Sequence, residues 1–165
     1  MKTPMALALA ALLAGAVPAL ALDCGFDHAI YGQDDSSSEL WFEPVDPAMG
    51  DGQANAFTLR LADFRRPLVG AVVWPDEEAE RPVASLTLDC PAEAAPDASC
   101  PIWQGTLYAV FADGGVLLAP DARDPAPPTL ILADLGPAIR AGNGRFGYET
   151  DEPVWDVFTL KACGT

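Results

Sequence analysis

The chain has 165 residues, of which 50% are hydrophobic and 20% charged, and its formal net charge at pH 7 is −15. This length suits one domain and leaves no room for two sizeable ones, and the apolar fraction is typical of a folded protein. The negative charge excludes nucleic acid as a partner, because a phosphate backbone repels an acidic protein, and it disfavours anionic membrane surfaces. No motif in the sequence assigns a specific biochemical activity.

The first 21 residues have the pattern of a secretory signal peptide. Lys2 supplies a positive start, residues 5–17 form an uncharged apolar run, and Ala19-Leu20-Ala21 offers small residues at a cleavage site. As a helix, the run spans about 20 Å, which falls short of the ~30 Å hydrocarbon core of a bilayer, so an uncleaved anchor is the weaker alternative. We predict cleavage after Ala21, and residues 22–165 as a single exported β-domain with no stable membrane span.

The predicted leader also indicates a route and a destination. No twin-arginine pair precedes the apolar run, which favours the general secretory route. Cleavage would leave 144 residues with a net charge of −16, since Lys2 is the only charged residue removed. The predicted location is therefore the periplasm or the extracellular space, where disulfides persist.

The four cysteines are interpreted as two structural disulfides. Three pairings are possible, and the absence of a Cys-x-x-Cys motif argues against a redox pair or a zinc site. We favour Cys90–Cys100, which closes a proline-containing loop between two predicted strands. The second predicted bridge, Cys24–Cys163, ties the mature N-terminus to the C-terminus, because the termini of single domains often lie close together.

Alternation of apolar and polar residues predicts an all-β domain. Leu40 and Phe42 share one face of residues 39–43, and Ala84, Leu86 and Leu88 share one face of residues 83–90, which is typical of half-buried strands. Residues 68–74 are apolar on both faces, which predicts a central strand. The predicted strands are residues 39–43, 57–61, 68–74, 83–90, 103–111, 116–118, 129–132 and 154–163.

Residues 134–141 form the one predicted helix, with Pro137 near its start and Gly142 at its end. Eight or nine short strands separated by frequent turn signals predict a small antiparallel β-sandwich or β-barrel, braced by the disulfides.

Two patterns resemble functional motifs but have simpler interpretations. Residues 142–147 match G-x-G-x-x-G, yet they follow a helix and precede the last strand, so we interpret them as a turn and not as a nucleotide site. The only histidine is His28, and a catalytic triad would need it beside Asp27 and a serine from Ser36–Ser38. No G-x-S-x-G elbow supports such a triad, so we interpret His28 as structural or solvated.

Carboxylates are the most abundant reactive groups, which leaves two chemical options open. Two carboxylates could perform acid–base hydrolysis of sugars, but their separation does not follow from sequence. Oxygen ligands suit calcium better than zinc, although residues 46–52 lack the spacing of an EF-hand. We assign no catalytic, cofactor-binding or metal-binding residue and leave calcium as the one ion to consider.

Tryptophans provide the best candidates for a binding surface. Trp41 and Trp155 alternate with apolar residues of their predicted strands, so we expect them to be exposed and available for binding. Core packing is the commoner role of a tryptophan in a strand, and it is the alternative for these two as well as for Trp74 and Trp103.

The leading interpretation is a non-enzymatic exported binding or interaction protein with an acidic surface. Its partner would be a protein or an envelope component, and a basic partner is favoured because opposite charges speed association. The alternatives are a small carboxylate-dependent hydrolase acting on sugars or cell-wall material, and a structural envelope protein.

The leader prediction is checked by the mass of the exported product. We expect a chain that begins at Leu22, because the cleavage motif ends at Ala21. Intact-mass spectrometry of the oxidised product measures this, and a product that retains residues 5–17 would contradict it.

Overall fold

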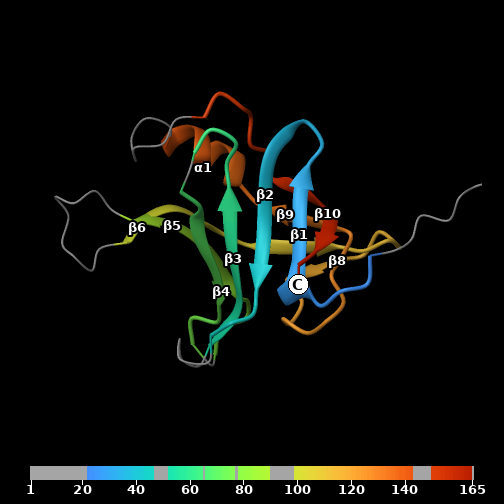
Figure 1. The fold of residues 1–165 in the computed structure, drawn as a ribbon. Helices are drawn as coiled ribbons and strands as arrows, with labels where there is room; N and C mark the ends of the chain where they lie inside the picture. Colours follow the sequence, from blue (N-terminus) through green and yellow to red (C-terminus); the bar gives the residue numbers. More distant parts are fainter. Residues whose placement is uncertain are drawn as a thin grey trace, which may run out of the picture.

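The computed structural model describes residues 22–46, 52–64, 66–76, 78–89, 99–142 and 150–164. Within these residues the protein is mostly β: ten antiparallel strands form one curled, half-barrel sheet accompanied by one α-helix (Figure 1). The predicted all-β fold is confirmed. The elements are η1 (Phe26–His28), β1 (Ala29–Gln33), β2 (Ser36–Glu43), β3 (Gln53–Arg60), β4 (Leu68–Val73), β5 (Val83–Asp89), β6 (Ser99–Gly105), β7 (Leu107–Val110), β8 (Val116–Leu118), β9 (Thr129–Leu132), α1 (Leu135–Gly142) and β10 (Val157–Cys163).

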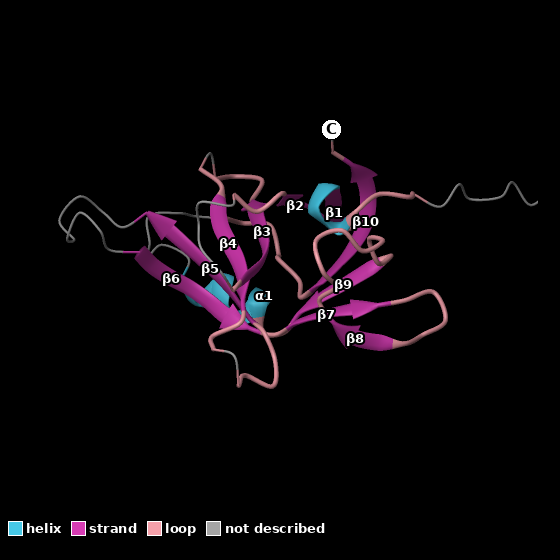
Figure 2. Cartoon of the chain, turned by 90° about the horizontal axis from the view of Figure 1, so that it is seen from below, coloured by secondary structure: helices cyan, strands magenta, loops and turns pink. Residues whose placement is uncertain are grey.

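One continuous stretch of chain belongs to both ends of the sheet. The strand order is β6-β5-β4-β3-β2-β1-β10-β9-β7-β8, yet only Thr106 separates β6 from β7 in the sequence. Gly105 pairs with Ala84 of β5, whereas Leu107 pairs with Leu132 of β9. In Figure 2 the chain passes directly from the β4–β6 side of the sheet to the β7–β9 side. The single strand predicted over residues 103–111 is therefore divided, and its division curls the sheet.

The crossing is fixed by contacts that require a glycine. The Trp103 indole Nε1 donates to the Ala133 carbonyl at 2.8 Å, and the Ala133 amide donates to the Thr106 carbonyl at 3.3 Å. A Cβ on Gly105 would lie 2.6 Å from the Trp103 ring and 3.0 Å from the Ala133 oxygen. Any larger residue would push Trp103 away from Ala133, since such distances are far below van der Waals contact.

An aromatic cluster fills the inside of the curl. The Phe26 and Phe42 ring centroids are 4.2 Å apart, and those of Phe42 and Phe57 are 5.4 Å apart. Tyr31 packs edge-on against Phe42 and donates its hydroxyl to the Pro127 carbonyl at 2.9 Å. Burial raises the pKa of Tyr31, which keeps its hydroxyl protonated as a donor. The inward faces predicted for β2 and β5 are confirmed, because their alternating apolar residues are buried.

The predicted central position of β4 is confirmed, but only one of its apolar faces is buried. Leu68, Gly70 and Val72 point inward, but Val69 is 57% exposed although β4 lies between two other strands. Gly70 is part of the inward packing: a Cβ there would lie 2.2 Å from the ring of Phe57, its partner on β3. On the outer face of β4, Val69 therefore faces solvent, while Ala71 and Val73 are half-buried.

The predicted Cys24–Cys163 disulfide is confirmed, with Cα atoms 6.0 Å apart. This disulfide holds the N-terminal segment that places Phe26 in the core. The Phe26 amide donates to the Asp124 carbonyl at 2.9 Å. The predicted helix is also found, displaced by one residue as Leu135–Gly142. Cys100 is not a free thiol, but Cys90 lies outside the described residues, so the Cys90–Cys100 bridge stays a prediction.

Two further predictions lie largely outside the described residues: the leader, residues 1–21, and the G-x-G-x-x-G segment, of which only Gly142 is described. Among the residues that are described, none of the helices is long and apolar enough to cross a membrane.

Replacing Cys24 and Cys163 together by serine is expected to lower the free energy of unfolding by about 5 kcal/mol, because the bridge restricts a very long loop in the unfolded chain. Urea unfolding of the oxidised proteins, followed by circular dichroism, measures this loss. A difference below ~1 kcal/mol would contradict this account of the bridge.

Candidate binding site

The site lies where β1 and β10 separate. The two strands pair up to Gly32 and Thr159, whereas Gln33, the last residue of β1, pairs only with Ser36 of β2 on its other side. The Gln33 side chain, only 9% exposed, spans the opening. Its Nε2 donates to the carbonyls of Trp155 at 2.6 Å and Val157 at 3.2 Å, while its Oε1 accepts from the Trp155 amide at 3.2 Å. The side-chain amide of Gln33 thus takes the place of the backbone hydrogen bonds that β1 and β10 no longer form.

The residue after Trp155 is anchored to a different element. The Asp156 carboxylate accepts from the amides of Asp134 at 3.0 Å and Gly136 at 2.7 Å, at the start of α1. A carboxylate at this position satisfies amides that have no partner within the helix and complements the positive end of the helix dipole. The Asp156 carbonyl also accepts from the Leu132 amide at 2.8 Å. The backbone of Trp155 is therefore restrained by its own bonds to Gln33 and by the bonds of the next residue, Asp156.

A third connection lies three residues before Trp155. The Glu152 carboxylate accepts from the Ser37 amide at 2.7 Å and from the Ser37 hydroxyl at 3.3 Å. The segment before β10 is thereby attached to the start of β2 as well as to β1 and α1. In Figure 1, the turn between β1 and β2 and helix α1 lie at the same end of the sheet, opposite the C-terminus.

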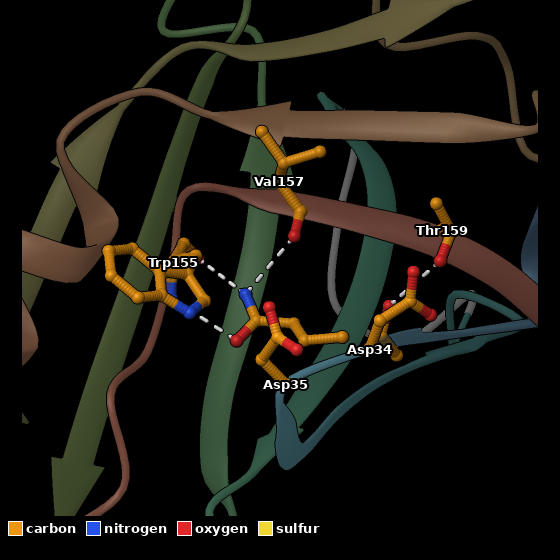
Figure 3. Close-up of a pocket in the computed structure, with 7 residues that line it drawn as sticks. Asp34, Asp35, Trp155, Val157 and Thr159 are labelled. Atoms are coloured by element: carbon orange, nitrogen blue, oxygen red, sulfur yellow. Dashed lines mark hydrogen bonds between the residues drawn. The ribbon is translucent and has the colours of Figure 1, made fainter.

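Trp155 is 51% exposed and forms a wall of two pockets. The first pocket has a volume of about 370 Å³ and the second about 360 Å³. In Figure 3, Trp155 stands at one end of the first pocket, with Asp34 and Thr159 toward the other. The first pocket is lined by Gly32, Gln33, Asp34, Asp35, Trp155, Val157 and Thr159, and the second by Gly136, Pro137, Arg140, Val154, Trp155, Asp156 and Val157.

The two pockets differ in charge. Asp34 and Asp35 stand at the edge of the first, where Asp34 forms an ion pair with Lys161. Asp35 is exposed and forms no ion pair with another described residue. Arg140 lines the second pocket, and within the described ranges it has no ion-pair partner either. Among the described residues, no ion pair therefore engages Asp35 in the first pocket or Arg140 in the second.

Trp41 is in a different environment from Trp155. It is half-buried, its Nε1 donates to Glu39 at 2.9 Å, and the Arg60 guanidinium lies 3.9 Å from its ring centroid. Trp74, 43% exposed, lies after β4 at the other end of the sheet, and Trp103 is buried. Of the two tryptophans predicted to be binding residues, Trp155 has the open ring, and binding by either stays a prediction.

The groups considered for catalysis are not brought together. Ser36–Ser38 begin β2 beside the end of β1, whereas His28 directly precedes β1, so the length of β1 separates them. His28 instead lies 3.9 Å from its neighbour Asp27. Over the described part of the chain, no three His, Cys, Asp or Glu side chains gather closely enough to hold a metal ion.

Comparison with known proteins adds no relative: no protein-family model, curated protein or solved structure matches the chain. The site must therefore be judged on its own geometry.

Sequence reasoning named Trp155 but missed Gln33 and Arg140. The only local signal at Gln33 is a polar residue that ends an apolar run before Asp34-Asp35. Its partners are more than 120 positions away in the sequence, so no local pattern reveals them.

Replacing Gln33 by Met is expected to release Trp155 while preserving the volume of the buried side chain. The change removes the donors and the acceptor that hold the Trp155 backbone, at a cost of about 1–3 kcal/mol. Amide hydrogen exchange measured by NMR should show faster exchange at Trp155. Ser37→Ala is the matched control, because it removes only an exposed hydroxyl bond, and unchanged protection of Trp155 in Gln33→Met would refute the role of Gln33.

Proposed function

We propose that this protein is a non-enzymatic exported binding protein whose Trp155 surface recognises a cationic segment of a protein partner. The observation that carries the proposal is an exposed indole on a backbone that is hydrogen-bonded to Gln33 at Trp155 and anchored through the neighbouring Asp156. A backbone already held in place loses little further conformational entropy on binding, and tryptophan is among the residues that dominate binding interfaces.

The chemistry around Trp155 favours a cation as the recognised group. The face of an indole attracts a Lys or Arg side chain through its quadrupole, at about 0.5–2 kcal/mol per contact. This protein already contains such a contact, since Arg60 covers Trp41. Asp35 on the pocket beside Trp155 would add a charge-assisted hydrogen bond to the same cation.

The charge of the whole chain supports the same choice. Asp34, Asp35, Asp151 and Glu152 lie on the two segments that Glu152 and Ser37 connect. Together with a net charge of −15, they would attract a basic partner before contact and speed its association.

The hydrolase alternative receives less support from the geometry. The two carboxylates of the pocket, Asp34 and Asp35, are adjacent in one turn and both exposed, and Asp34 is engaged with Lys161. Glycosidic cleavage needs two carboxyl groups on opposite sides of the scissile bond, one of them shielded from water so that it stays protonated.

The test is binding of a peptide with three lysines spaced by glycine and serine, with both ends blocked. Calorimetry at low salt should show binding of this peptide and none of an uncharged peptide of equal length. Trp155→Ala is expected to weaken binding about tenfold, or ~1.4 kcal/mol, through loss of the cation–π contact.

Trp74→Ala is the matched control, because Trp74 is also exposed but lies at the opposite end of the sheet. It should leave the affinity unchanged. Equal affinities of wild type and Trp155→Ala, or binding of an N-acetylglucosamine oligomer in place of the lysine peptide, would overturn the proposal. Release of reducing ends from that oligomer would favour the hydrolase instead.

A further inference from the structure

The two pockets beside Trp155 form one surface divided by a shared apolar wall. Trp155 and Val157 line both pockets, and they are 51% and 48% exposed. Because the same side chains border both hollows, a ligand that lies across the indole can place a group into each. The surface thus has two positions, one on either side of the wall.

The two positions carry opposite charges that no ion pair engages within the described part of the chain. On one side Asp35 has no ion-pair partner among the described residues, and its neighbour Asp34 adds a second carboxylate. On the other side stands the exposed guanidinium of Arg140. Arg140 offers up to five N–H donors in a fixed fork that matches a carboxylate.

Asp156 also lines the second pocket, but its carboxylate is already occupied. Its two oxygens accept from the Asp134 and Gly136 amides at the positive end of α1, which offsets part of its charge. The Arg140 Nη1 lies 3.3 Å from the position that a Cβ on Gly136 would take, so the guanidinium folds back along α1 toward this pocket. Arg140 therefore provides the donors that remain available for a ligand.

We propose that the Trp155 surface selects a dipolar protein segment, with a Lys or Arg side chain beside Asp35 and an Asp or Glu side chain against Arg140. This inference rests on the proposed function and names the partner's charge pattern. The aliphatic parts of both side chains would lie on Trp155 and Val157, since long charged side chains bury their stems along apolar surface. A bilayer is the less suitable partner, because the net charge of −15 opposes approach to anionic lipid.

The experiment compares blocked peptides of equal length that contain one lysine and one variable residue, Glu, Gln or Lys, separated by one, two or three glycines. Affinities are measured at low salt by calorimetry. For wild type, the Lys–Glu peptide is expected to bind about two- to fivefold more tightly than the Lys–Gln peptide at one of the spacings, the range of a single exposed ion pair. A mixture of separate Lys-only and Glu-only peptides should not reproduce this gain.

Two variants test Arg140 directly. Arg140→Gln should abolish the preference for Lys–Glu over Lys–Gln, and Arg140→Glu should reverse it, so that the Lys–Lys peptide binds best. Arg123→Glu is the matched control, because it makes the same change in net charge beside η1, far from the site. It should keep the wild-type preference, which separates a local effect of Arg140 from the total charge.

The outcomes separate this inference from the proposed function. If the lysine peptides bind through Trp155 but Lys–Glu and Lys–Gln bind equally, the dipolar selection is wrong and the cation site stands. If no lysine peptide binds, both are wrong. A preference for Lys–Glu that survives in Arg140→Glu would also overturn the assignment of the second position to Arg140.

Discussion

The crossing at Gly105 and Thr106 is the constraint on which the rest of this structure depends. One stretch of chain pairs with β5 before Thr106 and with β9 after it, so the two ends of a ten-stranded sheet must approach each other. Without that shared stretch, the inner faces of the two ends of the sheet would not pack against a single hydrophobic core. With it, residues from every strand except β8 pack into one core cluster around Phe26, Phe42 and Phe57. The bond from Trp103 to Ala133 fixes the crossing just before α1 begins.

A sheet that curls in this way cannot keep every neighbouring pair of strands together along its full length. The consequence is seen between β1 and β10, whose pairing ends at Gly32 and Thr159. An opening at the end of a sheet exposes backbone groups that need partners, and here the buried amide of Gln33 supplies them. The same bonds fix the backbone of Trp155. The candidate site is thus a consequence of closing the sheet.

Local pattern was sufficient for most of the fold. Period-2 alternation predicted the buried faces of β2 and β5, and the cysteine positions predicted the Cys24–Cys163 bridge. Strand β1 was missed because all five of its residues are buried, which leaves no alternation to detect. The exposure of Val69 on the outer face of β4 was not predicted, because an apolar side chain in a strand gives no sign that it faces solvent. The division at Thr106 and the Gln33 bridge depend on partners distant in sequence, which composition and spacing do not encode.

The value of Trp155 for recognition follows from how its backbone is held. A large aromatic side chain on a free loop would lose backbone and rotamer freedom on binding, and that loss would offset much of its contact energy. Here Gln33 and Asp156 restrict the backbone before any partner arrives, using hydrogen bonds that the fold requires in any case. Trp41 shows the contrasting solution, in which Arg60 and Glu39 from the same face occupy the ring and its nitrogen. The half-buried ring of Trp41 is thus engaged within the chain, whereas the ring of Trp155 is exposed on a restrained backbone, and this difference makes Trp155 the candidate for binding.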